Sequence, residues 1–429
     1  MDSHTRDLYV RGVAAAKSGD IDEALFYLEW LMRLEPPLQE KIDTYFWLSE
    51  IEPDPEKALA YVKDILVLDP SEPRARRKIA LAKGEYCKED EIVADQFQPA
   101  KGEVRDARAS RFICGRCGGR LSFQPAAQSL ICDSCQVITT AKTILPLMAD
   151  GVPEDDFIAN LATAKGHVQP VITQVIHCEG CNASFLISPG VISKNCPYCY
   201  SAYVLDMIKE ESILIPNGII PFKVPLKQAM LSFTDWLENH LDMKEVGMIR
   251  PMHGMYVPVW TFDIQGLIPW EAVDQKMHSA RIIKGEKNIY YDDYLMLATI
   301  RVSPVLHAAL KAFDLNALLP FHESYVADWP AEIFQISLAD ASLRVRQEIL
   351  SLERGEIERT SAQGSRNLHL DSTKMYIEAF RLILLPIWLC EYEIEQHGYK
   401  VAINGQTGCV YGTLPKSAKK SWISEFLGI

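Results

Sequence analysis

Apolar positions over residues 1–86 recur with the spacing of amphipathic helices, and the pattern that begins at Asp20 begins again at Asp54. Asp20 to Pro36 aligns with Asp54 to Pro70, and both stretches carry alanine, leucine and tyrosine at matching places. Small alanines let neighbouring helices approach closely, and the terminal proline ends the second helix because it lacks a backbone N–H. The pattern predicts helices over approximately these ranges: 6–18, 21–34, 41–50, 55–68 and 73–86.

The spacing from Asp20 to Asp54 is the period of tetratricopeptide repeats, which residues 1–86 resemble. The resemblance implies a concave groove that takes a peptide of a partner protein. A plain helical bundle, self-association and packing within the chain are the alternatives. Residues 87–111 then change character, because they are charged and keep no apolar period, and we expect them to form a linker.

Eight of the eleven cysteines form two copies of one pattern, Cys-x2-Cys-x14-Cys-x2-Cys. Each Cys-x2-Cys pair turns two thiolates toward one point, and two pairs complete a tetrahedral shell for zinc. The pattern predicts two β-rich zinc ribbons at 112–140 and 171–206, joined by a connector at 141–170, and two bound zinc ions. The expected ligands are Cys114, Cys117, Cys132, Cys135, Cys178, Cys181, Cys196 and Cys199.

Cys-x2-Cys pairs also occur in thioredoxin-like redox sites and in iron–sulfur or iron–thiolate centres, which are the alternatives here. A redox pair would stand alone between a strand and a helix, whereas each pair in this chain has a second pair. Gly118 and Asn182 follow the second cysteine of a pair, where a positive φ is common and both residue types tolerate it. Because four cysteines leave no open position on the metal, we expect structural ions.

A strand-rich region with frequent prolines begins near residue 213. In this region the order of proline motif, helix and proline-containing strand occurs twice. The two copies run from Ile219 through a helix near 226–239 to Asp263, and from Leu318 through a helix near 338–354 to Trp388. We therefore expect a pseudo-duplicated α+β domain over 213–429, with halves of about 213–312 and 313–429.

Three features inside this domain have expected places. Pro258 and Pro386 are expected at sheet edges or bulges, because proline cannot donate to a ladder. Trp260 and Trp388 are expected to anchor the core. The stretch from Asn404 to Gly408 is expected to form a hairpin turn, since glycine supplies positive φ.

No catalytic motif is found in the sequence. His-Glu-x-x-His, Gly-x-Ser-x-Gly, phosphate-loop and dinucleotide sequences are all missing. We therefore expect a protein without catalytic activity. An unrecognised enzyme in the C-terminal domain is an alternative, and a deep pocket with polar side chains from both halves would favour it.

Charge bears on the choice of partners. The formal net charge of −13 repels nucleic acid and anionic membranes on average. The first ribbon is an exception. Arg111, Arg116 and Arg120 surround its first Cys-x2-Cys turn, a type of turn called a zinc knuckle. Phe112 and Phe123 are close to it in sequence. A basic and aromatic face of this kind favours phosphate or single-stranded nucleic acid. A solvated arginine cluster is the plainer alternative.

Membrane insertion is not indicated by the sequence. No apolar signal segment stands at the N-terminus, and the strongly apolar run from Leu382 to Cys390 is far shorter than the roughly 20 residues that span a bilayer. We expect a cytoplasmic protein with reduced thiols. The tail from Lys416 to Ile429 mixes lysines with apolar residues; peripheral contact with a membrane or a partner is one alternative for it, and packing on its own domain is another.

Several unrelated motifs occur in one order along the chain. They are Cys196-Pro-Tyr-Cys199, Ile220-Pro-Phe222, Tyr256 to Asp263, Leu385-Pro-Ile-Trp388, Asn404 to Gly408 and Gly412 to Pro415. In these motifs the chain from about residue 110 onward resembles a bacterial family of uncharacterised double zinc-ribbon proteins. The ribbons of that family are of the transcription factor IIB type or similar to those of replication-restart helicases. The resemblance implies zinc binding and this domain order, and it implies no reaction.

These patterns predict a multidomain α+β protein with an N-terminal α-helical repeat, two β-rich zinc ribbons and a pseudo-duplicated α+β domain. We expect a zinc-binding adaptor or scaffold that binds a protein partner through the helical repeat. A nucleic-acid-binding protein that acts through the first ribbon is the alternative.

Overall fold

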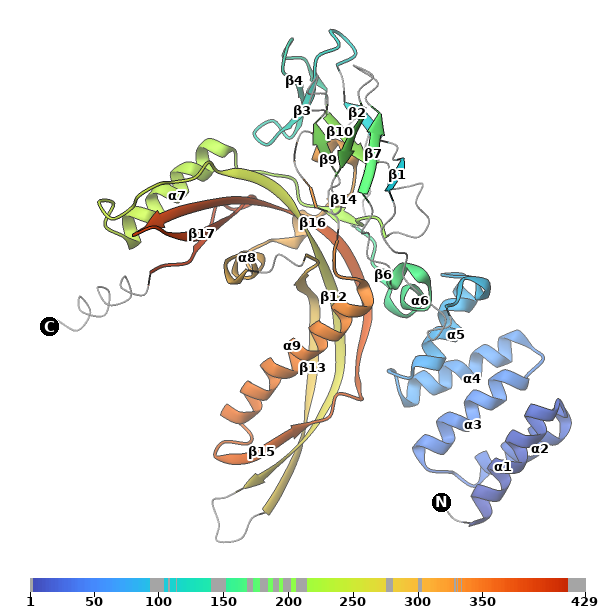
Figure 1. Cartoon of the computed structure of the whole chain (residues 1–429). Coiled ribbons are helices and arrows are strands. Elements are labelled where there is room, and N and C mark those ends of the chain that lie inside the picture. Colours follow the sequence, from blue (N-terminus) through green and yellow to red (C-terminus); the bar gives the residue numbers. More distant parts are fainter. Residues whose placement is uncertain are drawn as a thin grey trace.

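The structure is a computed structural model, and it describes most of the chain. The described ranges are 3–92, 104–106, 109–112, 114–139, 152–167, 173–177, 184–187, 193–195, 202–205, 214–274, 281–299, 303–327, 329, 331–332 and 334–415. Over these ranges the protein is of the α+β class and has several parts, as the sequence predicts. Figure 1 shows N-terminal helices beside a long, bent sheet, with small β-sheets above the bend.

The N-terminal part consists of helices. They are α1 (Ser3–Ser18), α2 (Ile21–Arg33), α3 (Leu38–Ile51), α4 (Pro55–Leu68) and α5 (Pro73–Lys83), close to the expected ranges. Asp20 caps α2 by accepting from the N–H of Glu23, and Asp54, at the matching place of the repeat, caps α4 by accepting from the N–H of Glu56. The matching aspartates explain why both helices begin where the pattern repeats.

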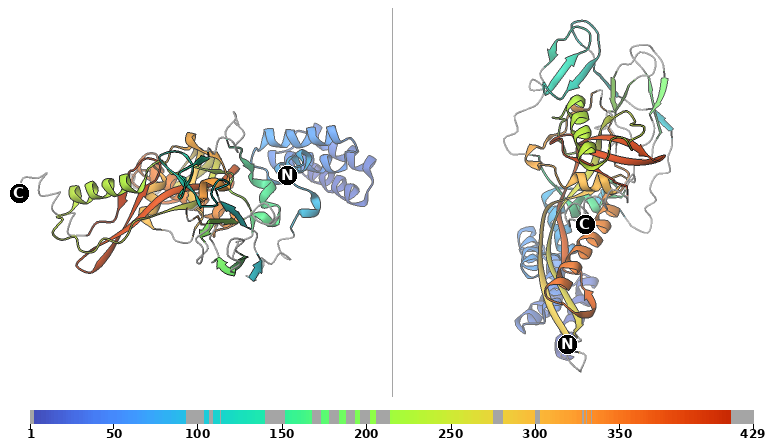
Figure 2. Two further views of the ribbon diagram at one scale, coloured as in Figure 1. Left: turned by 90° about the horizontal axis from the view of Figure 1, so that it is seen from above. Right: turned by 90° about the vertical axis from the view of Figure 1, so that its left-hand side faces the viewer.

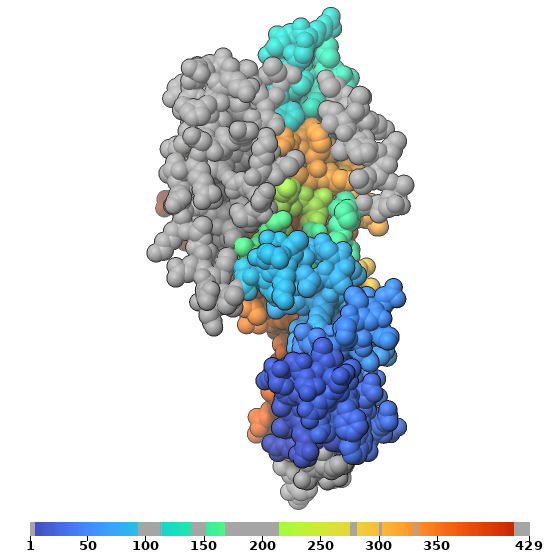
Figure 3. All heavy atoms as spheres, turned by 90° about the vertical axis from the view of Figure 1, so that its right-hand side faces the viewer, coloured from blue at the N-terminus to red at the C-terminus, as the bar shows by residue number. Residues whose placement is uncertain are grey.

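The helical part touches the sheet through α5 and α6 (Phe157–Leu161). Ala80 from α5 shares a small buried cluster with Ala159 and Ala162. The guanidinium of Arg76 lies 5.0 Å from the centre of the Tyr376 ring. The right-hand view of Figure 2 and the space-filling view of Figure 3 show the helices toward one end of the molecule and residues 114–139 at the other.

Among the described residues, strands between residues 104 and 205 form three small sheets. One contains β1 (Val104–Asp106), β7 (Thr173–His177) and β8 (Ser184–Ile187), and another contains β2 (Ala109–Phe112), β10 (Ala202–Leu205) and β9 (Ser193–Asn195). The third contains β3 (Leu121–Gln124), β4 (Ser129–Cys132) and β5 (Ile138–Thr139), all antiparallel. Strands this short bury little apolar surface by themselves, so sheets of this size need other support.

The main sheet is mixed, and its centre is the antiparallel pair of β12 (His253–Asp274) and β16 (Met375–Ile394). Its other described strands are β6 (Asp155–Asp156), β11 (Gly218–Ile219), β13 (Arg281–Leu297), β14 (Leu319–Pro320), β15 (Ser365–Leu370), β17 (His397–Asn404) and β18 (Val410–Gly412). β13 pairs with the outer edge of β12 and β17 with the outer edge of β16.

Alternate side chains of the central pair face two different apolar cores. Trp260 and Phe262 face a core that includes α7 (Leu226–His240) and α9 (Leu338–Arg359). Val257 and Leu385 face a second core formed with α8 (Pro304–Leu310). We call this second side of the sheet the α8 face. No helix among the described residues is long and apolar enough to cross a membrane.

The same hydrogen bonds recur in two parts of the main domain. The indole N–H of Trp260 donates to Ile336 O, as that of Trp388 does to Val224 O. The backbone N–H of Glu332 donates to Tyr256 O, as that of Ile220 does to Leu384 O. The backbone N–H of Gln335 donates to Ala298 O, as that of Lys223 does to Gly405 O. The two indole bonds are both 3.0 Å, and so are the two backbone bonds to Tyr256 and Leu384. Trp260 and Trp388 are 0% and 3% exposed, which confirms that they anchor the core.

Pro258 and Pro386 do not lie at sheet edges or bulges, so that prediction is wrong. Both lie inside the central strands, opposite Leu384 and Tyr256. Their carbonyls accept from the N–H groups of Ala298 and Gly405, which lie on the outer sides of the pair. The missing proline N–H therefore faces away from the β12–β16 ladder, which loses no bond.

The predicted hairpin turn is present between β17 and β18. The side chain of Asn404 accepts from the N–H groups of Gln406 and Thr407 at 2.8 and 3.0 Å. Gly408 has φ +82°, which a residue with a side chain rarely adopts.

Candidate metal centre

Four of the predicted ligands converge at one end of the small β3–β4–β5 sheet. The Sγ atoms of Cys114, Cys117, Cys132 and Cys135 all lie within 4.8 Å of one another. The Sγ–Sγ distance is 3.6 Å between Cys114 and Cys135 and 3.4 Å between Cys117 and Cys132. Four thiolates about 2.3 Å from one zinc ion would stand about 3.8 Å apart, so the cluster fits a tetrahedral metal ion.

The two Cys-x2-Cys turns have matching backbone hydrogen bonds. The N–H of Cys114 donates to Gly119 O at 2.7 Å, and the N–H of Gly118 donates to Cys114 O at 2.8 Å. In the second turn the N–H of Cys132 donates to Val137 O at 3.0 Å, and that of Gln136 to Cys132 O at 3.0 Å. Each turn therefore presents its two thiols to the same point in the same way.

A positive φ follows the second cysteine in both turns. Gly118 has φ +71°, as the sequence predicts. Gln136 has φ +56°, and this the sequence did not predict, because glutamine carries no signal for the left-handed region. The requirement therefore belongs to the turn and not to the residue type.

Backbone N–H groups favour thiolates at the start of each turn. The N–H of Cys135, and with it that of Ser134, lowers the pKa of Cys132 to about 6. The N–H groups of Arg116 and Cys117 lower the pKa of Cys114. Hydrogen bonds to the charged form make these thiols ready metal ligands, because only the thiolate binds a metal ion.

The opposite end of the β3–β4 hairpin packs on the core of the main domain through Phe123 and Leu130. The Phe123 ring is fully buried, and its centre lies 5.3 Å from that of Tyr325 in an edge-to-face contact. The indole N–H of Trp329 donates to Phe123 O at 2.8 Å, and the Gln128 side chain donates to Phe222 O at 2.6 Å. The cysteine cluster is therefore held at a fixed place on the α+β domain.

The second predicted ligand set cannot be placed. Cys178, Cys181, Cys196 and Cys199, together with Asn182, lie outside the described residues. Strands β7 to β10 are described between and beside them, and they belong to two different small sheets.

The three arginines of the predicted nucleic-acid face differ in their surroundings. Arg116 is exposed, and Arg111 lies in β2. Arg120 forms an ion pair with Asp133, with 2.8 Å between Nε and Oδ2. Phe123 is buried and cannot stack on a base, so the aromatic contribution expected from this residue is wrong.

A second group of titratable side chains lies on the α8 face. The carboxylates of Glu154, Asp263 and Asp293 lie within 4.8 Å of one another. Arg381 pairs with Asp293 and, at 3.1 Å, with Glu154. Burial, followed by a hydrogen bond with Asp263, raises the pKa of Glu154 to about 7. Arg381 already supplies the positive charge here, so the group resembles an ion-pair network more than a metal site.

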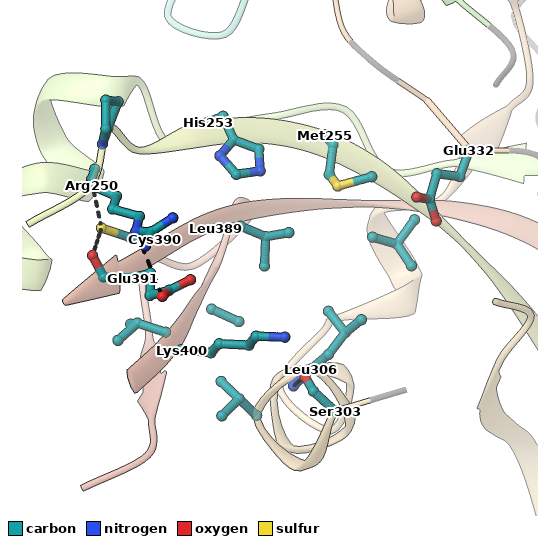
Figure 4. A pocket seen from close by; sticks show the side chains of 15 residues that line it. Arg250, His253, Met255, Ser303, Leu306, Glu332, Leu389, Cys390, Glu391 and Lys400 are labelled. Atoms are coloured by element: carbon teal, nitrogen blue, oxygen red, sulfur yellow. Dashed lines mark hydrogen bonds and ion pairs between the residues drawn. The ribbon is translucent and has the colours of Figure 1, made fainter. Parts of the chain in front are cut away.

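A groove of about 630 Å³ lies on the same face of the sheet, between α8 and the strands β12, β16 and β17 (Figure 4). Its side chains come from both expected halves, His253 from β12 and Lys400 from β17 among them. Met255, Leu389 and Leu306 supply apolar surface between the charged groups. The sequence did not identify this groove, because no motif marks residues that meet only through strand pairing.

Comparison with known proteins gives one informative similarity. The chain is similar to an uncharacterized protein, YdjG of Bacillus subtilis (strain 168), with 25% identity over 238 residues. The match spans 50% of this chain and 69% of YdjG. No family model matches the chain, and no solved structure matches it.

Proposed function

We propose that this protein is a zinc-binding scaffold, in which structural zinc holds small ribbons on the α+β domain and the N-terminal helices bind a protein partner. The observation that carries the proposal is the convergence of four thiols in two turns with matching hydrogen bonds. All four positions are cysteine, so a zinc ion here would have no open position for a substrate. The ion would stabilise the ribbon and would supply no catalytic chemistry.

A second zinc ion is supported by the sequence. Cys178, Cys181, Cys196 and Cys199 repeat the spacing of the first set, and that first set converges as its spacing predicts. The motif order shared with bacterial double zinc-ribbon proteins supports the same assignment. We also propose that the protein resides in the cytoplasm, because free thiols and zinc–thiolate sites suit a reducing compartment.

The partner surface is assigned to the outer face of α2. Phe26, Trp30 and Leu34 are 60%, 41% and 43% exposed, and they follow each other at helical spacing. The ring centres of Phe26 and Trp30 lie 5.7 Å apart. Exposed aromatic side chains grouped on one helix are typical of protein interfaces, whereas single exposed apolar residues need no explanation.

The α+β domain is proposed to be an internal duplication. The matching bonds to Ile336 and Val224, and to Tyr256 and Leu384, support two copies of one unit. Because these bonds match Ile220 with Glu332 and Val224 with Ile336, the counterpart of Ile219 to Phe222 in the second half is residues 331–334. Leu318 to Phe321 is not that counterpart, because β14 lies there and pairs antiparallel with β11.

Binding of nucleic acid through the first ribbon has weaker support. Arg120 is engaged by Asp133 and Phe123 is buried, which leaves Arg116 as an exposed basic side chain at the knuckle. Replacement of Arg116 by Glu should leave any affinity for single-stranded DNA and its salt dependence unchanged. A clear loss of affinity would favour the nucleic-acid alternative.

The scaffold proposal is tested by separating metal binding from partner binding. Full-length protein and the Phe26→Glu/Trp30→Glu variant are used to recover partners from cells of the source organism, with zinc content measured on the same samples. We expect the variant to keep its zinc and lose its specific partner. A matched control is Leu231→Glu, a 59% exposed leucine on α7 far from α2. An identical partner set for both variants would contradict the proposal.

A further inference from the structure

We propose that the groove on the α8 face binds an extended segment of a partner protein that carries a carboxylate side chain. The inference rests on the duplication proposed above and is independent of zinc. It starts from the opposite end of the same face, where this chain fills an equivalent position with its own residues.

The equivalence follows from the strand registers. Pro258 of β12 corresponds to Pro386 of β16. The same shift along the chain makes His253 the counterpart of Arg381. The strand pairs Thr261–Arg381 and Leu389–His253 are therefore equivalent. The same shift relates Asp263 to Glu391. The N–H groups of Ala298 and Gly405 donate to the carbonyls of Pro258 and Pro386, and these equivalent bonds relate β13 to β17. Counted along the two strands from these residues, Asp293 corresponds to Lys400.

At the first position, a segment of the chain itself is bound. β6 adds to the outer edge of β16, where Asp156 and Asp155 pair with Ala379 and Phe380. The Glu154 carboxylate reaches Arg381, with 3.1 Å between Oε1 and Nη2. Arg381 also donates to the backbone carbonyl of Val152 at 3.2 Å. An extended acidic segment therefore occupies this end of the face.

At the second position, the groove takes the place of that segment. The counterparts of Ala379 and Phe380 are Pro251 and Met252, and no described strand pairs with their outer edge. The groove of about 630 Å³ is lined there by Arg250, Pro251 and His253 (Figure 4). Since Pro251 offers no N–H, an occupant would be held more by side-chain contacts than by a ladder.

The charges of the groove favour a carboxylate more than those of the occupied end do. Around Glu154, one guanidinium faces two aspartates. In the groove the corresponding groups are His253, Glu391 and Lys400, so an ammonium replaces one carboxylate. Among the described residues neither His253 nor Lys400 has an ion pair or side-chain hydrogen bond, and both are exposed.

The remaining charged groups of the groove are already engaged or lie elsewhere. The guanidinium of Arg250 lies 3.6 Å from the carboxylate of Glu391 and 3.3 Å from that of Glu393. It therefore offsets the negative charge of Glu391, the cross-strand neighbour of Lys400. Glu332 lies at the other end of the groove in Figure 4, next to apolar surface from Met255. An occupant with a carboxylate at the His253 end and apolar side chains toward Glu332 fits this distribution.

The probe for a test is a labelled, end-blocked peptide with the sequence of residues 152–158, which fills the equivalent position. Its binding to zinc-loaded full-length protein is followed by fluorescence anisotropy. We expect saturable binding that Lys400→Glu and His253→Glu each weaken about 10-fold or more, as a lost charge-assisted contact would. A peptide with Gln in place of its single Glu, which corresponds to Glu154, should bind more weakly by a similar factor. Lys227→Glu on α7, away from the groove, is the matched control and should leave the affinity unchanged.

Three results would overturn the inference. One is no binding at about 1 mM peptide. The second is binding that Lys400→Glu and His253→Glu leave unchanged but Arg381→Glu alters, which would place the peptide at the already occupied end. The third is displacement of the peptide by octanoate at equal concentration, which would assign the groove to small aliphatic acids. Zinc content measured on the same samples reports on the metal proposal separately.

Discussion

The β3–β4–β5 ribbon and the α+β domain are stabilised in different ways. The domain buries aromatic and aliphatic side chains on both sides of β12 and β16, and Trp260 and Trp388 are almost inaccessible. The ribbon has a buried cluster of its own that consists of Cys114, Leu121 and Cys132. A segment this short cannot bury enough apolar surface to fold alone. One end of it carries four converging thiols that could hold a metal ion, and the other end packs on the core of its neighbour.

The largest effect is expected at the cysteine end of the ribbon, where the buried cluster is too small to replace a bound metal ion. Cys132→Ser should abolish zinc binding at this cluster, because structural zinc supplies about 10–16 kcal/mol of apparent binding free energy in small zinc domains. The knuckle end should then be cut rapidly by trypsin at the exposed Arg116, while the α+β domain stays resistant. Cys87→Ser, at an exposed cysteine outside the cluster, is the control and should keep both zinc and resistance. Equal zinc content in both variants would break the comparison.

The next effect concerns the end of the ribbon that borrows a core. Phe123→Ala removes a fully buried ring that packs on Tyr325, and we expect a loss of about 3–5 kcal/mol in the stability of the docked ribbon. Zinc content should stay the same, because the thiols lie at the opposite end. Chemical denaturation followed by intrinsic tryptophan fluorescence, to which Trp329 beside Phe123 contributes, measures the loss. Phe26→Ala, at a ring that is 60% exposed, should change little.

A smaller effect distinguishes the two knuckles. Gly118→Ala should destabilise the zinc-loaded ribbon by about 1–2 kcal/mol, because Gly118 has φ +71° and only the backbone conformation opposes a side chain there. Gln136→Gly should act in the opposite direction by about 1 kcal/mol, since a non-glycine residue already bears that strain. Competition with a chelator compares the zinc affinities of the two variants with that of the unmodified protein. The same sign for both substitutions would show that the knuckles are not equivalent.

The smallest effect concerns the acidic segment at the occupied end of the α8 face. Burial, followed by the hydrogen bond with Asp263, raises the pKa of Glu154 from 4.5 to about 7. A carboxyl with a raised pKa in the folded state stabilises that state while it is protonated, so its contribution is present below pH 4.5 and is lost as the pH rises through about 7. Glu154 is 37% exposed, and the effect should stay below about 1 kcal/mol. Urea midpoints at about pH 5 and about pH 8 should differ less in Glu154→Gln than in the unmodified protein. An unchanged difference would remove Glu154 as its cause.

Local signals in the sequence predicted most of what depends on neighbours along the chain. The spacing of Cys114, Cys117, Cys132 and Cys135 predicted their convergence because each knuckle fixes two thiols within a few residues. Contacts between distant segments were not predictable in this way. The bond from Trp388 to Val224 and the burial of Phe123 arise only when the sheet is assembled. The proposed counterpart of Phe222, Phe334, was missed because the equivalence is expressed in hydrogen bonds rather than in a proline motif.

The central claim is tested most directly by native mass spectrometry of the full chain, purified without added metal and without chelator. The account predicts two zinc ions per chain. It also predicts that the eight cysteines of the two Cys-x2-Cys-x14-Cys-x2-Cys patterns stay unreactive toward a thiol reagent until the zinc is removed. A metal-free chain with freely reactive cysteines, or a chain that carries iron, would contradict it.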